Sequence, residues 1–242
     1  TQTHDYRQQN QHEARRVIAG GYSAVVFDLD GTLADTAADV QQALARALAT
    51  EGLPPIDVAA TRIMIGGGPR MLVERALHRL GMPIREPLAE RLTHAFHAEY
   101  LKQENKLSSL FEGVESSLRQ MHAAGTRLGL CSNKPDDLCR LLVRDFGLDA
   151  LFDEVLGSGS GLPRKPDPAP LLRIIELLGA TPNDTLYVGD SETDVVTARN
   201  AGVQVMLVDY GYTLRAASQL GADAVISSLA ELVRPGYLAR SA

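Results

Sequence analysis

Short apolar runs alternate with helical patterns along most of this chain, and this alternation limits the fold more than any other feature of the sequence. The runs lack the every-second-residue polarity of a strand with one wet face, so they predict parallel strands buried on both sides. They lie at Ala24–Phe27, Arg127–Leu130, Thr185–Val188, Val203–Val208 and Ala222–Ile226, with a weaker run at Glu154–Leu156. Alternating strands and helices predict an α/β fold, a three-layer Rossmann-like sandwich around a parallel sheet.

A long interval between the first two strands breaks this rhythm. The first run ends at Phe27, and the second does not begin until about Thr126. Apolar side chains in the interval recur every three or four residues, as in amphipathic helices, at Val40, Ala43, Leu44, Ala47 and Leu48 and again at Leu88, Leu92, Ala95 and Phe96. We therefore expect an α/β core formed by residues 21–36 and 109–242, with a helical domain inserted at 37–108. Residues 1–20 are expected to form a polar, Gln-rich arm.

Composition limits the classes of function. No apolar run approaches the roughly 20 residues that span a membrane, and the N-terminal residues offer no apolar core for a signal peptide. The net charge of −6 argues against nucleic-acid binding, which needs a basic face. Cys131 and Cys139 match no zinc or redox spacing, so we expect free thiols in a cytoplasmic protein. No membrane or nucleic-acid partner is expected, and the chain should be a monomer or weak homodimer.

Polar clusters follow the predicted strands and turns at four places, where ligands bind in open α/β sheets. The first cluster, DLDGTLADT, begins at Asp28. Asp28 and Asp30 leave the strand two residues apart, so both carboxylates can face one cleft and share a cation, while Thr32 adds a hydroxyl. A lone Asp at a strand end is often only a turn residue, and Asp35 and Thr36 can cap the following helix.

The second and third clusters supply a hydroxyl, an amide and an ammonium group. Ser132 and Asn133 follow the second strand, and a hydroxyl with free backbone amides at a helix start makes a phosphate site. Either residue as a plain helix cap explains the same pattern. Lys165 precedes a proline pair that starts a helix, although a lone lysine in such a turn is usually a solvated surface residue.

The fourth cluster follows the strand Thr185–Val188 and contains two acids, Asp190 and Asp194, one helical turn apart. Magnesium prefers a few carboxylates together with water and substrate phosphate oxygens, so this pair suits a magnesium site. Acids at a helix start also suit the helix dipole, an explanation that serves Asp194 better than Asp190.

In this order the four clusters resemble the motifs of the haloacid dehalogenase superfamily, with the helical insert where helical caps occur in that family. The resemblance covers about residues 23–233. It implies that Asp28 attacks phosphorus to form an aspartyl-phosphate, and that Asp30 protonates the leaving group and then activates water. It further implies Mg²⁺ held by Asp28, the backbone carbonyl of Asp30 and Asp190, with Asp194 beside it.

The same resemblance assigns the phosphoryl oxygens to Ser132 and Lys165, with Thr32 and Asn133 as further substrate contacts. A narrower resemblance is to the phosphoglycolate phosphatases. It rests on three segments: IGGG with LVERAL in the insert, SNKP after the second strand, and DYGY after a later one. It implies hydrolysis of a small phosphorylated metabolite, 2-phosphoglycolate, to glycolate and phosphate. Gly66, Gly67 and Gly68, together with Arg75 or Arg70, would then face the substrate, although a plain turn and a solvated helix face explain them equally well.

The superfamily also contains dehalogenases, phosphomutases, phosphonate hydrolases and pyrophosphatases. A haloacid dehalogenase needs neither the second acid nor the metal, so Asp30 together with Asp190 counts against it. A phosphomutase or phosphonate hydrolase is expected to place a lysine in the cap, whereas Lys102 and Lys106 lie near its exit. Phosphatases of sugar phosphates, nucleotides or pyrophosphate share all four motifs and stay open. If the chain were a catalytically silent binding protein, at least one of the four motifs should have lost a key residue, and none has.

Overall fold

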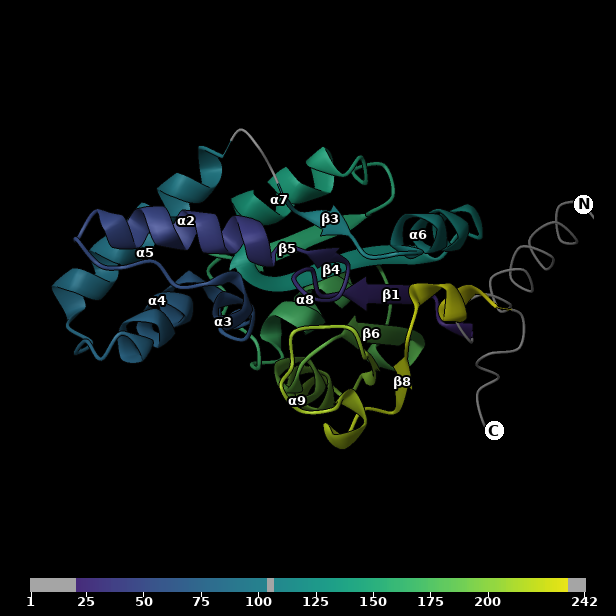
Figure 1. The fold of residues 1–242 in the computed structure, drawn as a ribbon. Coiled ribbons are helices and arrows are strands. Elements are labelled where there is room, and N and C mark those ends of the chain that lie inside the picture. The colour runs from purple at the N-terminus through teal and green to yellow at the C-terminus, as the bar shows by residue number, and fades with distance from the viewer. Residues whose placement is uncertain (1–20, 104–106, 235–242) are drawn as a thin grey trace, which may run out of the picture.

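The computed structural model describes residues 21–103 and 107–234, so the predicted N-terminal arm lies outside the described residues. Six parallel strands form one sheet in the order β5-β4-β1-β6-β7-β8 (Figure 1). Their bounds are β1 Ala24–Phe27, β4 Arg127–Pro135, β5 Glu154–Ser158, β6 Thr185–Gly189, β7 Gln204–Val208 and β8 Ala224–Ile226. All six predicted strands are present, the weaker one included.

Helices cover both faces of this sheet, which confirms the predicted three layers. One face packs against α6 (Val114–Ala123) and α7 (Asp136–Asp145), and the other against α8 (Ala169–Leu177) and α9 (Glu192–Ala201). Successive side chains of a strand point to opposite faces, so β1 serves both layers. Val25 and Phe27 join the cluster that contains α6 and α7, whereas Ala24 and Val26 join the cluster of α8 and α9.

Four further helices form a separate cluster at the end of the sheet toward which β1 points (Figure 1). They are α2 (Ala37–Ala49), α3 (Val58–Arg62), α4 (Gly68–Arg79) and α5 (Glu86–Leu101), here called the helical unit. The apolar stripes predicted for α2 and α5 are buried against one another in this second core. The chain enters and leaves the unit through a two-stranded antiparallel pair, β2 (Ala34–Asp35) and β3 (Ser109–Leu110), too short for a sequence signal.

One prediction about the second polar cluster is wrong. The sequence predicts that Ser132 and Asn133 begin a helix, whereas both lie inside β4, and α7 begins only at Asp136. The strand continues because, after a register shift, Pro135 still pairs with Ser158 of β5. Ser132 and Asn133 therefore present their side chains from the irregular part of a strand, between Cys131 and Pro135, rather than from a helix terminus.

The two cysteines are free and buried, as their spacing predicts. Burial raises the pKa of the Cys131 thiol to about 12, so this group stays protonated at neutral pH. In the part of the chain that the structure describes, no helix has the length and apolar character needed to cross a membrane.

The packing of the helical unit can be tested at Leu44, which is fully buried in α2. Truncating a buried leucine removes apolar contacts and leaves a cavity, so we expect Leu44→Ala to lower the free energy of unfolding by about 2–5 kcal/mol in urea denaturation. Leu101→Ala, at a position 46% exposed on α5, should change it by less than about 0.5 kcal/mol. Equal losses for the two variants would contradict a core built around α2.

Candidate active site

The carboxyl ends of three neighbouring strands bring the predicted polar clusters together. Phe27 of β1 lies level with Leu130 of β4 and with Val188 of β6. Because these parallel strands end side by side, Asp28, Ser132 and Asp190 emerge at the same edge of the sheet. This is also where the strand order reverses direction next to β1, the position at which open α/β sheets bind ligands.

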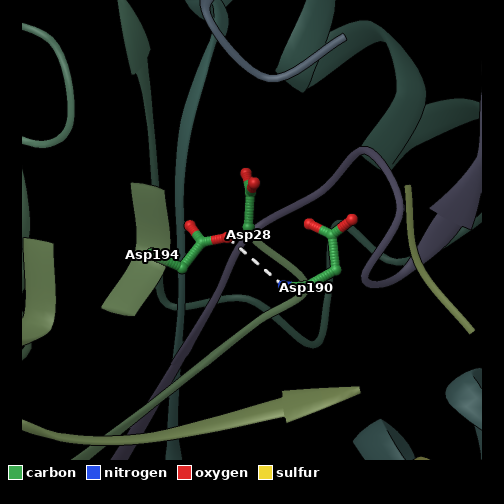
Figure 2. Close-up of side chains that lie close together, drawn as sticks. All are labelled: Asp28, Asp190 and Asp194. Atoms are coloured by element: carbon green, nitrogen blue, oxygen red, sulfur yellow. Dashed lines mark hydrogen bonds between the residues drawn. The ribbon is translucent and has the colours of Figure 1, made fainter. Parts of the chain in front are cut away.

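Three acids from this edge form a compact cluster. Asp28, Asp190 and Asp194 are buried, and each offers a carboxylate oxygen within 4.8 Å of the other two. Figure 2 shows the three side chains close together, with the backbone N–H of Asp190 donating to Oδ2 of Asp194. The ammonium of Lys165, also buried, lies 3.1 Å from Oδ2 of Asp28 and 2.8 Å from Oδ1 of Asp194.

The charges of this cluster do not balance, because three carboxylates share one ammonium group. Burial raises the pKa of Asp28 to about 6, although the Lys165 charge opposes that shift. Burial, together with the charges of Asp194 and Asp28, raises the pKa of Asp190 well above its usual value. A divalent cation would relieve this repulsion, and an all-oxygen donor set suits Mg²⁺. The residues present therefore fit the ion that the family resemblance implies.

Asp194 differs from the other two acids because both of its oxygens already accept hydrogen bonds. Its Oδ1 accepts from Lys165 and from the Tyr187 hydroxyl at 2.8 and 2.9 Å. Its Oδ2 accepts from the Ser191 hydroxyl and from the backbone N–H groups of Ser191 and Asp190. Burial alone would raise the pKa of Asp194, but Lys165 and these donors together lower it. Asp194 thus caps α9 and also orients Lys165.

Asp190 is held by the loop after β7, which contains the DYGY segment. In the sequence this segment was only part of the family resemblance and had no predicted contact. The backbone N–H of Tyr212 donates to Oδ2 of Asp190 at 2.6 Å, and the Tyr212 hydroxyl donates to Asp35 at 2.8 Å. Gly31 faces the same carboxylate with a φ of +84°, and a Cβ there would lie 2.4 Å from Oδ2 of Asp190. The acid cluster therefore needs glycine at this turn.

Asp30 belongs to a second charge cluster, built around a lysine that had no predicted role. Nζ of Lys134 lies 3.0 and 3.3 Å from the two carboxylate oxygens of Asp30. The Thr36 hydroxyl, expected to cap a helix, makes no cap bond and donates to Oδ1 of Asp30 at 2.6 Å. The Tyr100 ring covers the ammonium, 4.5 Å from its centroid. The signal for Lys134 was its place in SNKP, beside two predicted site residues.

Ser132 and Asn133 differ in what their side chains contact: Ser132 contacts an acid of the cluster, whereas Asn133 contacts backbone groups. The Ser132 side chain hydrogen-bonds to Asp28, which helps to lower the pKa of that acid. Asn133 donates from Nδ2 to the carbonyl oxygens of Gly66 and Lys165, both at 3.0 Å, and accepts from the Lys165 N–H at 2.9 Å. Its amide therefore orients backbone groups. The contact with substrate predicted for Asn133 stays a prediction.

Thr32 is a predicted site residue that lies apart from the acid cluster and the cavity. It is fully buried, and its hydroxyl has no hydrogen-bond partner among the described residues. The residues that line the cavity beside Asp28 do not include it. Its carbonyl oxygen accepts a hydrogen bond from the Tyr210 hydroxyl at 3.0 Å. A role of Thr32 in substrate binding is therefore still only a prediction.

A cavity separates the strand ends from the helical unit. Asp28, Asp30, Ser132, Asn133 and Lys134 line it from the core, while Val40, Ile65, Gly66, Gly68, Pro69, Leu72 and Phe96 line it from the helical unit. Gly68 comes so close to the core that a Cβ would lie 2.9 Å from the Asn133 carbonyl oxygen. Gly66 and Gly68 thus line the cavity, whereas Gly67 does not.

A second groove, which Asp30 also lines, contains the last predicted residue, Arg75. Arg75 lines it together with Asp30, Gly66, Asp190 and Arg215. The Arg75 guanidinium donates to the carbonyl oxygens at positions 64 and 65, at 2.8 and 3.4 Å, and so also supports the glycine loop. Arg70, by contrast, is taken up in ion pairs with Glu74 and Glu86 on the surface of the helical unit.

Comparison with known proteins agrees with this geometry. Residues 25–208 match the family model of the haloacid dehalogenase-like hydrolases. The phosphoglycolate phosphatase of Rhodospirillum rubrum is 39% identical over 213 residues, covering 86% of this chain and 88% of that protein. The phosphoglycolate phosphatase of Caulobacter vibrioides is 37% identical over 210 residues, covering 87% and 89%.

The solved structures give the same result. The crystal structure of a predicted phosphoglycolate phosphatase from Haemophilus somnus superimposes with a TM-score of 0.81 at 29% identity, covering 88% of this chain and 96% of that one. The family model spans the sheet from β1 to β7, and with it the four polar clusters. The chain therefore belongs to the haloacid dehalogenase-like hydrolase family and is a phosphoric monoester hydrolase.

Proposed function

We propose that this enzyme is a Mg²⁺-dependent phosphatase that hydrolyses 2-phosphoglycolate through an aspartyl-phosphate on Asp28. The observation that carries the proposal is the separation of two acids at one cavity. Asp28 lies with Lys165 and the acid cluster, while Asp30 lines the same cavity but has its own partners. One carboxylate can thus act as nucleophile and the other as acid and base. We expect the enzyme to act in the cytoplasm as a monomer or weak homodimer.

In the first step, an oxygen of the Asp28 carboxylate attacks phosphorus while the bond from phosphorus to the ester oxygen breaks. Asp30 gives its proton to the departing alkoxide, which leaves as the alcohol. Lys165 and the Ser132 hydroxyl lie beside Asp28 and hold the phosphoryl oxygens. When bound by Asp28, the Asp30 carbonyl and Asp190, Mg²⁺ supplies positive charge that offsets the charge of the phosphoryl group.

In the second step, Asp30 accepts a proton from water as the water oxygen attacks phosphorus of the aspartyl-phosphate. The bond between phosphorus and Asp28 breaks, which frees inorganic phosphate and restores the carboxylate. Asp30 is then protonated again, ready for the next turnover. Asp194, whose oxygens both accept hydrogen bonds, orients Lys165 and the start of α9 and would stand beside the ion as a nearby or water-mediated ligand.

The helical unit acts as the cap in this proposal, with residues 37–108 as its extent. It closes the cavity over Asp28 and Asp30, which excludes bulk water from the aspartyl-phosphate. Its contribution to the cavity wall is mostly apolar, including Val40, Leu72 and Phe96. Such a wall offers few partners for the hydroxyl groups of a sugar, so it favours a compact leaving group.

The names of the relatives supply the specific substrate. Proteins named phosphoglycolate phosphatase are 37–39% identical to this chain over most of its length. Glycolate is a small acid, and the groove beside Asp30 offers two cationic side chains, Arg75 and Arg215. We therefore assign 2-phosphoglycolate ahead of hexose phosphates, nucleoside monophosphates and pyrophosphate.

A substrate panel tests this assignment. Phosphate release with Mg²⁺ should give the highest kcat/KM for 2-phosphoglycolate among hexose phosphates, nucleoside monophosphates, pyrophosphate and an aryl phosphate. A preference for another member would keep the mechanism and change the substrate. No release from any member, the aryl phosphate included, would favour a catalytically silent protein.

The division of roles predicts different behaviour for two isosteric variants. Asp28→Asn should release no leaving group from any substrate, because the nucleophile is lost. Asp30→Asn should slow release of glycolate in a single turnover by about 10²–10⁴-fold, the usual contribution of general acid catalysis. Release of an aryl alcohol should slow much less, because that leaving group departs without a proton. Equal losses on the two substrates would refute the acid role of Asp30.

Binding of Mg²⁺ should depend on pH in a defined direction. The pKa of Asp28 is raised to about 6 and that of Asp190 is raised as well, so a proton must leave before the ion can bind. Affinity should therefore rise with pH, by about tenfold per pH unit for each carboxylate still protonated. The rise in Tm on adding Mg²⁺ should be larger at about pH 7.5 than at about pH 5.

The variant Asp190→Asn is the matched control for this measurement, and its Tm should respond weakly to Mg²⁺ at either pH. An equal Mg²⁺ response of the unaltered enzyme at both pH values would contradict binding by these carboxylates. EDTA should abolish phosphate release, and excess Mg²⁺ should restore it.

A further inference from the structure

We propose that Lys134, together with Thr36, is a positioning residue that holds the carboxyl group of Asp30 at the cavity wall for proton transfer to the leaving group. This inference rests on the proposed function and extends it to residues with no assigned role. It starts from the way the two buried lysines are divided between the two acids. Lys165 contacts Asp28 and Asp194, whereas Lys134 contacts Asp30.

The contacts to Asp30 come from two directions and restrict rotation of its carboxyl group. Oδ1 accepts from the Thr36 hydroxyl at 2.6 Å and from Lys134 at 3.0 Å, and Oδ2 lies 3.3 Å from the same ammonium. Thr36 precedes α2, and Lys134 extends from the end of β4, so the carboxyl group is held between the two parts of the molecule.

Lys134 is itself held in place by its surroundings. Its ammonium lies over the ring of Tyr100, a residue of α5 in the helical unit, and its side chain is only 5% exposed. A cation over an aromatic face is attracted by the ring quadrupole, more strongly where water is excluded. The helical unit therefore determines where the ammonium lies, and the ammonium determines where Asp30 lies.

Stability alone is a weak reason for this arrangement. A buried ion pair is often no more stabilising than apolar side chains of similar volume, because both charges lose their hydration. Asp30 and Lys134 instead line the cavity beside Asp28. A general acid must lie within hydrogen-bond reach of the oxygen it protonates, and a misplacement of about 1 Å can cost about 100-fold in rate. Holding the Asp30 carboxyl at this wall meets that requirement.

The test compares leaving groups that need a proton with those that do not. Lys134→Met keeps the length of the side chain and removes its charge. In a single turnover at saturating 2-phosphoglycolate with Mg²⁺, we expect glycolate release to slow by about 10–100-fold. Release of an aryl alcohol should slow much less, and the KM for either substrate should change little. Lys102→Met, which removes an exposed lysine paired with Glu99, is the control and should behave as the unaltered enzyme.

Two further comparisons separate positioning from a general structural effect. In the Asp30→Asn background, Lys134→Met should add no further loss in glycolate release, because the group that it positions is gone. Thr36→Val, which loses the hydroxyl, should slow glycolate release selectively, whereas Thr36→Ser, which keeps it, should restore most of the rate.

The outcomes distinguish this inference from the proposed function. If Asp30→Asn itself shows no difference between the two leaving groups, the acid role of Asp30 fails and the inference fails with it. If Asp30→Asn shows the difference but Lys134→Met slows both substrates equally or neither, positioning by Lys134 is overturned. If Lys134→Met does not fold, the Thr36 pair decides, and equal rates for Thr36→Val and Thr36→Ser overturn the inference.

Discussion

The contact of one lysine with two acids underlies the rest of this active site. Lys165 spans Asp28 and Asp194 in a region where water cannot solvate the charges. Burial raises the pKa of Asp28, and the Lys165 charge is the largest influence that opposes this rise in a cluster of three carboxylates within 4.8 Å of one another. Much of the surrounding structure serves this contact. Asn133 holds the Lys165 backbone from both directions, and Tyr187 donates to Asp194 beside it.

The second cluster, around Asp30, also pairs an acid with a buried lysine. Asp28 and Asp30 contact different lysines, Lys165 and Lys134 respectively. In the proposed mechanism this separation matters because the two acids have different tasks, one as nucleophile and the other as acid and base. The two lysines come from different elements, since Lys134 lies near the end of β4, beyond the residues that pair with β1, while Lys165 reaches Asp28 from the loop before α8.

The sequence predicted the sheet well because its strands are buried on both faces and read as apolar runs. It predicted the four polar clusters because each directly follows such a run or turn. It did not predict the continuation of β4 through Ser132, which depends on pairing with β5. Nor could it show that Lys134 contacts Asp30, because the two residues are 104 positions apart and only the folded sheet makes them neighbours.

The paired connections β2 and β3 have a consequence for the architecture of the family. Ala34 lies opposite Leu110, and Asp35 lies opposite Ser109, so the chain returns to the point from which it left. Opposite residues in an antiparallel pair are only about 5 Å apart, which a short turn can bridge. The α/β core therefore does not depend on the length of the chain between them. Evolution can lengthen, shorten or exchange this segment as a module, and the strand order of the sheet is unaffected.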